Sequence, residues 1–213
     1  MAVVNGVMGT YSILLGKGDG TFQPAATYAA GGTRYQASVA AGDFNGDGKP
    51  DLALASGSVI ILLGNGDGTF RALPAIPFAN LPKAIAVADF NGDGKQDLAV
   101  AHGDISILIG HGDGTFEQPV QYPAQGTSIA IADFNGDGKP DLALAGGESL
   151  GTVPILLGNG DGTFQSGFIY FGGQLTNLMV AGDFNGDGKP DGVIRLRCCL
   201  PVDEHYAMNT AAR

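Results

Sequence analysis

One nine-residue segment occurs four times in the chain with almost no change. The copies run from Asp43 to Asp51, from Asp89 to Asp97, from Asp133 to Asp141 and from Asp183 to Asp191. In each copy, side chains with oxygen atoms occupy positions one, three, five and nine, and glycines occupy positions four and six. Because the segment recurs at intervals of 46, 44 and 50 residues, it indicates a fold built from repeated units.

The spacing of these oxygen atoms is typical of a loop that binds a hard divalent cation. Calcium takes about six to eight oxygen ligands at about 2.3–2.6 Å, and a main-chain carbonyl fills position seven of such a loop. No copy contains His or Cys, so a nitrogen- or sulfur-bound metal is not indicated. We therefore predict about four calcium ions, one per loop. The predicted ligands are Asp43, Asn45, Asp47, Lys49, Asp51, Asp89, Asn91, Asp93, Lys95, Asp97, Asp133, Asn135, Asp137, Lys139, Asp141, Asp183, Asn185, Asp187, Lys189 and Asp191, with each lysine contributing its carbonyl.

An acidic, glycine-rich surface turn is the alternative interpretation, because Asn-Gly and Asp-Gly pairs are common turn formers. Four copies with three carboxylates each argue against it. Two like unit charges about 4 Å apart repel by ~1 kcal/mol in water and ~4 kcal/mol at an effective dielectric constant near 20. Loops without a cation would therefore be costly, which favours the calcium interpretation.

The residues on either side of each segment predict strands. Runs such as residues 84–88 and 98–101 alternate small and larger apolar side chains, so each loop joins two strands. An EF-hand instead closes with a bidentate Glu at position twelve and is flanked by helices. Here position twelve is apolar, which excludes an EF-hand and a dockerin-like pair: Leu54, Val100, Leu144 and Ile194. A nine-residue calcium solenoid is excluded by the long interval between the loops.

A second repeated motif supports the same period. It consists of an apolar run, a glycine-rich turn and Thr-Phe, which predicts a strand, a tight turn and another strand. Each turn holds one isolated Asp, which we expect to shape the turn and not to bind metal. The motif spans residues 15–22, 63–70, 109–116 and 157–164, and its aspartates are Asp19, Asp67, Asp113 and Asp161.

The alternation of the two motifs resembles the FG-GAP and VCBS repeat family, which includes the propeller head of integrin α chains and many bacterial secreted proteins. The resemblance covers nearly all of residues 1–197. It implies an all-β fold, a β-propeller whose blades are four-stranded antiparallel sheets. It also implies that calcium binds in the hairpin loop between the first two strands of a blade, at Asp43, Asn45, Asp47 and Asp51 in the first copy.

The motifs divide residues 1–197 into about four blade equivalents. We expect a partial blade over 1–36, units over 37–83, 84–127 and 128–177, a partial blade over 178–197, and a non-repeat C-terminal tail over 198–213. Such a chain forms either an open fragment of a larger propeller or a small closed ring. Residues 2–5 and 192–195 both resemble the second strand of a blade, so one would be redundant in a ring. The open arc is therefore favoured, and its open sheet edges are expected to allow self-association.

The phenylalanines of the two motifs are expected to pack between neighbouring blades. They are Phe44, Phe90, Phe134 and Phe184 in the loops, and Phe22, Phe70, Phe116 and Phe164 in the turns.

The net charge of −10 follows from the loops, which hold twelve of the 21 acidic residues. Four divalent ions would bring the charge to about −2, which leaves little preference for basic partners. The eleven Lys and Arg residues are scattered, so nucleic acid binding is not expected. Cys198 and Cys199 are adjacent, which disfavours a disulfide between them.

The sequence shows no apolar run long enough to span a membrane, and no signal peptide is visible. Loops of this modular kind bind calcium at extracellular concentrations. We therefore expect an extracellular or cell-surface location.

Candidate catalytic groups are sparse. His102, His111 and His205 lie apart from any nucleophile motif, so we predict no catalytic residues and no enzyme activity. A calcium-binding repeat module for protein interaction or adhesion is the favoured function. The alternatives are a carbohydrate-binding propeller that stacks sugars on Tyr35, Tyr122 or Tyr170, and an accessory domain of a secreted hydrolase or lyase. The partner is thus an unknown protein or glycan.

Overall fold

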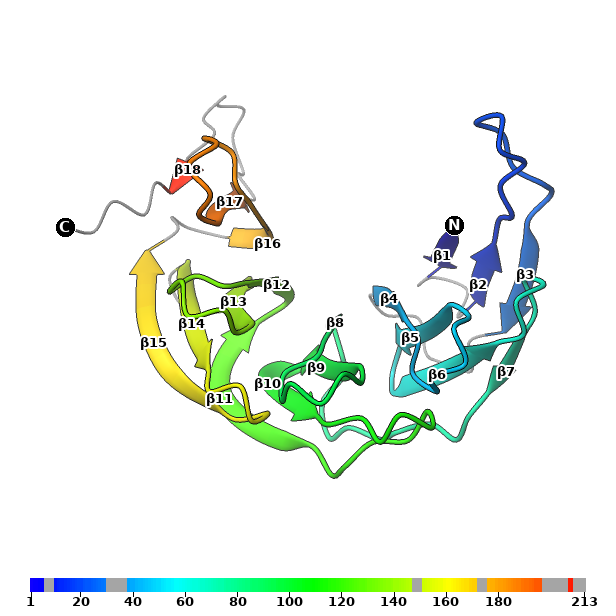
Figure 1. Ribbon diagram of the computed structural model, residues 1–213, viewed down its shortest axis with the longest axis horizontal. Helices are drawn as coiled ribbons and strands as arrows, with labels where there is room; N and C mark the ends of the chain where they lie inside the picture. Colours follow the sequence, from blue (N-terminus) through cyan, green and yellow to red (C-terminus); the bar gives the residue numbers. More distant parts are fainter. Residues whose placement is uncertain (6–9, 30–37, 147–150, 172–175, 197–206, 209–213) are drawn as a thin grey trace.

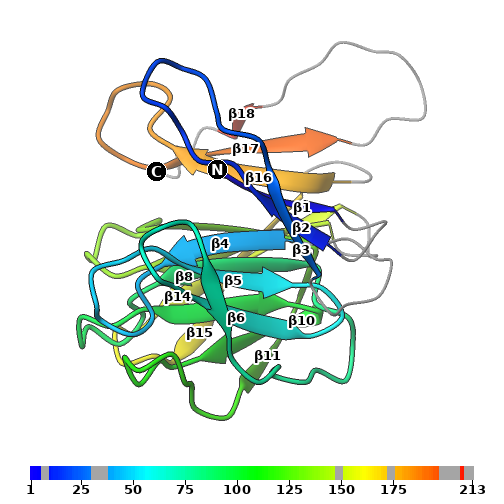
Figure 2. The same cartoon turned by 90° about the vertical axis from the view of Figure 1, so that its right-hand side faces the viewer.

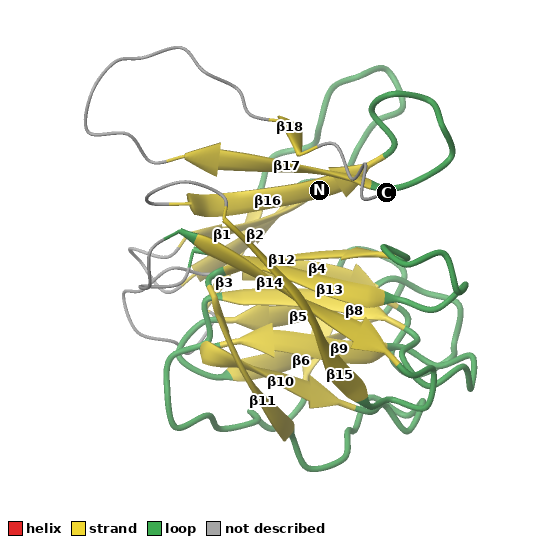
Figure 3. Ribbon diagram, turned by 90° about the vertical axis from the view of Figure 1, so that its left-hand side faces the viewer, coloured by secondary structure: helices red, strands yellow, loops and turns green. Residues whose placement is uncertain are grey.

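The computed structural model describes residues 1–5, 10–29, 38–146, 151–171, 176–196 and 207–208. Figure 3 shows that this part of the chain consists of strands and loops, with no helix. The strands form five antiparallel sheets, which stand side by side in an open arc (Figure 1).

Three of the sheets have four strands and the two at the ends have three. The first sheet contains β1 (Ala2–Asn5), β2 (Thr10–Ile13) and β3 (Ala26–Ala29). The second contains β4 (Ser38–Gly42), β5 (Asp51–Ala55), β6 (Val59–Gly64) and β7 (Phe70–Ala72). The third contains β8 (Ala84–Ala88), β9 (Asp97–Ala101), β10 (Gly103–Leu108) and β11 (Val120–Gly126).

The fourth sheet contains β12 (Ser128–Ala132), β13 (Asp141–Ala145), β14 (Thr152–Gly158) and β15 (Phe164–Phe171). The fifth contains β16 (Thr176–Gly182), β17 (Asp191–Leu196) and β18 (Ala207–Met208). Two residues of the segment 198–213 therefore pair with β17, and the rest of that segment lies outside the described residues.

Each sheet is a propeller blade. The strands β4, β8, β12 and β16 lie on the inside of the arc, and β7, β11 and β15 lie on the outside (Figure 1). The predicted all-β fold of antiparallel blades is thus confirmed. The sheets do not close into a ring, because β1 and β17 each act as the second strand of a separate sheet. Of the two predicted arrangements, the open arc is the one observed.

The hydrophobic core lies between neighbouring blades. The central strand β5 is buried on both faces, and successive side chains of a strand point to opposite faces. Leu52 and Leu54 pack toward the first blade, while Ala53 and Ala55 pack toward the third. Alternation of leucine with alanine therefore gives β5 one large and one small face, and the strand of residues 141–145 has the same sequence.

The motif phenylalanines join the inner blades, as predicted. Phe44 and Phe90 are almost fully buried and meet Phe116 and Phe164 edge to face, with ring centroids 5.9 Å and 5.4 Å apart. The prediction is wrong for Phe22 and Phe184, which are 44% and 60% exposed. These two residues belong to the end blades, where no further sheet covers them.

Candidate metal centre

The four repeated loops each connect the first strand of a blade to the second. They join β4 to β5, β8 to β9, β12 to β13 and β16 to β17, so every predicted ligand lies at a hairpin end. Figure 2 shows the loop after β4 and the loop after β16 on the same side of the arc.

Side chains of the loop bind its own backbone. The carboxylate of Asp43 accepts hydrogen bonds from the N–H groups of Asp47 (3.2 Å) and Gly48 (2.8 Å). Asn45 Oδ1 accepts from Asp47 N–H (3.0 Å), and Asp47 Oδ1 accepts from Lys49 N–H (2.9 Å). The chain can curl this tightly because Gly46 and Gly48 have φ angles of 70° and 77°. The loops at 89–97, 133–141 and 183–191 repeat these bonds.

The aspartate at position nine lies behind the loop and ties it to the third strand. Asp51 is fully buried, and its two oxygens accept from Phe44 N–H (2.9 Å) and Gly64 N–H (2.7 Å). Asp97 and Asp141 make the same pair of bonds, and Asp191 accepts from Phe184 N–H.

The glycine whose N–H donates this bond is a residue of the site that the sequence prediction missed. A Cβ atom on Gly64 would lie 2.2 Å from the carbonyl oxygen of Pro50. Gly110 and Gly158 have the same conflict with residues 96 and 140. The sequence feature that could have identified this residue is the glycine at the end of each third strand, within the second repeated motif.

The electrostatics of the loops favour ionised carboxylates at the surface. The N–H of Lys49 lowers the pKa of Asp47, and the N–H of Lys95 lowers the pKa of Asp93. Gly188 N–H likewise lowers the pKa of Asp183. Burial has the opposite effect at position nine, where it raises the pKa values of Asp97 and Asp141.

The carboxylates of a loop do not converge in the structure. Among the described residues, no three Asp, Glu, His or Cys side chains form a group that could hold a metal ion. Asp47 Oδ2 is instead 3.3 Å from Lys49 Nζ, and Asp93 Oδ2 is 3.6 Å from Lys95 Nζ.

The donor chemistry of the loops nevertheless suits calcium. The side chains offer only oxygen, which hard cations prefer. A carboxylate can accept about four hydrogen bonds in total, so Asp43 and Asp51, each with two N–H donors, keep acceptor sites for a cation.

The aspartates of the second motif shape turns. Asp67 Oδ1 accepts from both the N–H (2.9 Å) and the hydroxyl (2.6 Å) of Thr69, and the hydroxyl is the main cause of its lowered pKa. Asp19, Asp113 and Asp161 do the same.

Two of these turns also contact the repeated loop of the preceding blade. Gly114 N–H donates to the carbonyl of Phe44 (2.8 Å), and Gly162 N–H donates to the carbonyl of Phe90 (3.0 Å). A ligand that orders either of these two loops would therefore act on the junction between two blades.

One buried polar pair lies at the other end of the blades. His102 Nε2 and Ser106 Oγ are 2.7 Å apart, and burial lowers the pKa of His102. Both residues are buried, so this pair does not present a nucleophile to solvent. The sequence prediction did not connect these two residues.

The structure describes two of the three tyrosines that a carbohydrate-binding propeller would use to stack sugars. The ring of Tyr122 packs against Phe164, and its hydroxyl accepts from Phe164 N–H (3.1 Å). This residue is therefore part of the blade junction. Tyr170 is partly exposed on β15, and Tyr35 lies outside the described residues.

The sequence matches the FG-GAP-like repeat over residues 1–54, 44–100, 89–144 and 133–194. No match is found among curated proteins. The described part of the chain contains no helix long and apolar enough to cross a membrane.

Solved structures show a similar fold. One is the crystal structure of BBS1N in complex with ARL6DN, soaked with lead, with a TM-score of 0.58, 20% identity, and coverage of 78% of this chain and 52% of that one. The crystal of the same complex soaked with mercury gives a TM-score of 0.55, 14% identity, and coverage of 88% and 55%. The chain thus spans about half the length of these solved chains.

Proposed function

Since the chain belongs to the FG-GAP-like repeat family, we propose that it is a calcium-binding, non-catalytic module for protein interaction at the cell surface or outside the cell. The observation that carries the calcium proposal is the repeated loop geometry. All four loops fold on their own Asp and Asn side chains, and the carboxylate groups still keep acceptor sites that these bonds do not use.

Calcium would be held by the oxygens of positions one, three, five and nine, together with the carbonyl of position seven. The bound ion would offset the repulsion between the carboxylates and release Asp47 from Lys49. Because Phe44 and Phe90 carry the carbonyls that the next blades bind, the ion would also fix the blade junctions.

Isothermal titration calorimetry on chelator-treated protein tests this proposal. We expect about four sites for calcium and far weaker heats for magnesium, which demands a tighter octahedral geometry. An Asp93→Ala variant should lose one site and keep the others. A titration with fewer than three sites, or an Asp93→Ala variant with all sites intact, contradicts the proposal.

A protein partner is supported by the fold and by one exposed strand. The similar solved structure is a complex with a protein, and β15 exposes Phe168, Ile169 and Phe171 by 69–71%. Long, apolar edge strands favour pairing with another chain. We therefore place the partner surface on the outer edge of the fourth blade.

The two ends of the arc supply a further apolar surface. On the last sheet, Val180 and Phe184 are 51% and 60% exposed, and on the first sheet Val3 and Phe22 are 43% and 44% exposed. Side chains at these places are covered by the next blade elsewhere in the arc. These faces would support self-association.

A further inference from the structure

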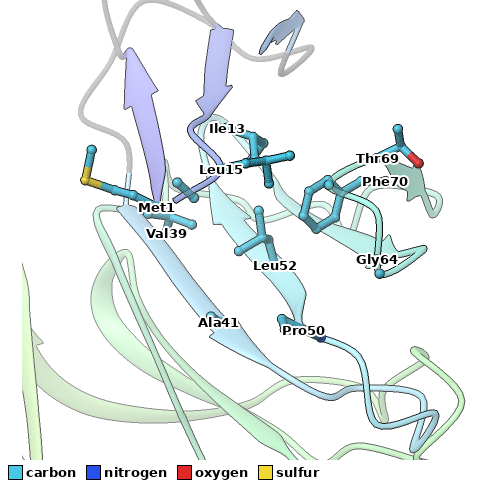
Figure 4. A pocket seen from close by; sticks show the side chains of 13 residues that line it. Met1, Ile13, Leu15, Val39, Ala41, Pro50, Leu52, Gly64, Thr69 and Phe70 are labelled. Carbon is cyan, nitrogen blue, oxygen red and sulfur yellow. The ribbon is translucent and has the colours of Figure 1, made fainter. Parts of the chain in front are cut away.

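A hollow of about 460 Å³ opens between the first and second sheets. Its walls are apolar, and Figure 4 shows Ile13, Leu15, Leu52 and Phe70 around the open space. Ala41 and Val39 of β4 complete one side.

The same place is filled at the next two blade junctions. Between the second and third sheets, Phe44 packs edge to face on Phe116 and accepts a hydrogen bond from Gly114 N–H at its carbonyl. Between the third and fourth sheets, Phe90 makes the same contacts with Phe164 and Gly162. Phe44 and Phe90 are each the second residue of the loop that follows the first strand of their blade.

Residues that line the hollow correspond to residues that surround Phe44 and Phe90. Phe70 and Gly68 take the places of Phe116 and Gly114 in the repeated turn. Ala41 pairs with Leu52 as Val87 pairs with Leu98, so these residues are also counterparts. The hollow therefore has the shape and the N–H donor of a socket for a loop phenylalanine.

The first sheet also has an open strand edge beside this socket. Among the described strands its order is β1-β2-β3, so β1 lies at its edge, whereas β5 and β9 each have a first strand beside them. An open edge accepts an added strand through main-chain hydrogen bonds. The hollow and the edge of β1 together therefore offer the two kinds of contact that a first strand and its loop make in the other blades.

We propose that the hollow is a docking site for a strand-and-loop segment of a partner polypeptide. The segment has alternating small and β-branched residues that pair antiparallel with β1, followed by Asp-Phe. The phenyl ring enters the hollow, and the carbonyl of that residue accepts the Gly68 N–H. The chemistry of the partner follows from Phe44 and Phe90, which occupy the two equivalent sockets.

Fluorescence anisotropy with the full chain tests the proposal. The probe is a labelled peptide with the sequence of residues 84–93, Ala-Ile-Ala-Val-Ala-Asp-Phe-Asn-Gly-Asp, which carries β8 and the start of its loop. We expect saturable binding, and binding at least about tenfold weaker when alanine replaces the peptide's phenylalanine, because the ring is its largest apolar group. Equal binding of the two peptides, or no binding at about 1 mM, overturns the proposal.

Two protein variants locate the site. Ala41 is exposed on the wall of the hollow, so Ala41→Glu should place a charge there and abolish binding. Ala72 is equally exposed on β7 of the same sheet but outside the hollow, so Ala72→Glu should bind the peptide normally. Normal binding by Ala41→Glu contradicts the proposed site. Should Ala41→Glu fail to fold, the comparison of the two peptides on the unaltered chain still decides.

Discussion

At the scale of single residues, the tightest constraint falls on the glycine that ends each third strand. Gly64 lies against the carbonyl of Pro50 and donates to buried Asp51, so one residue joins the repeated loop to the body of the blade. Gly16 holds the same position in the first blade, but a Cβ there would meet no atom of the described residues within 4 Å.

This contrast gives a matched pair of substitutions. Gly64→Ala should lower the free energy of unfolding by about 1–3 kcal/mol, because the added methyl group forces the loop away from the third strand. Gly16→Ala should change it by less than about 0.5 kcal/mol. Urea unfolding of both variants in calcium measures the difference. Equal losses would show that the Pro50 contact does not matter.

His102 makes the stability depend on pH. Burial lowers its pKa in the folded state, while the unfolded value is about 6.5, so protonation favours the unfolded chain. The stability that the neutral ring contributes is present above about pH 6.5 and is lost as the pH falls toward the lower, folded pKa.

Melting temperatures at about pH 7.5 and pH 5.5 test this effect. The fall on acidification should be smaller in His102→Ser, a variant that copies Ser56, the counterpart in the second blade. Acidification also protonates carboxylates, but this contribution to the fall in melting temperature is the same in the unaltered protein and in His102→Ser. The same fall in both would exclude His102 as the cause.

At the scale of elements, a loop and a turn meet at the junction of the second and third blades and at the junction of the third and fourth blades. Phe44 is 2% exposed at such a junction, so Phe44→Ala should cost about 3–5 kcal/mol of unfolding free energy. Phe184 holds the same loop position in the last blade but is 60% exposed, so Phe184→Ala should cost less than about 0.5 kcal/mol. Equilibrium unfolding measures both, and a large loss from Phe184→Ala would mean that a further element covers it.

The elements themselves could be predicted from the sequence, because the loops and the alternating strands are local patterns. The hydrogen bonds between elements could not. Asp51 bonds Gly64 and Phe44 bonds Gly114, and these partners are brought together by the sheet and by the stacking of blades. Phe22 and Phe184 are exposed because no neighbouring sheet of the described residues covers them. Identical motifs therefore have different environments.

At the scale of the whole molecule, the open arc exposes faces that other blades bury. Val180 is 51% exposed on the face of the last sheet that points away from the fourth blade. Val120 has a similar exposure of 53% but lies on β11, the outermost strand of the third blade. If the end faces associate, the mass from light scattering should rise with protein concentration. Val180→Lys should suppress that rise and Val120→Lys should not. A monodisperse monomer at every concentration contradicts self-association.

Calcium should determine the stability of the whole arc. With a dissociation constant near ~0.1 mM, each site adds about 1.4 kcal/mol at ~1 mM calcium, and four sites add about 5–6 kcal/mol. That gain is comparable to the ~5–15 kcal/mol net stability of an ordinary domain.

The most direct test is the thermal unfolding of one protein sample in calcium and in excess chelator, with magnesium as the control cation. We predict that chelation lowers the melting temperature by roughly 10–20 °C for a chain of this size, and that calcium but not magnesium restores it. Melting curves that coincide in calcium and in chelator would show that the four loops are turns held by their own hydrogen bonds.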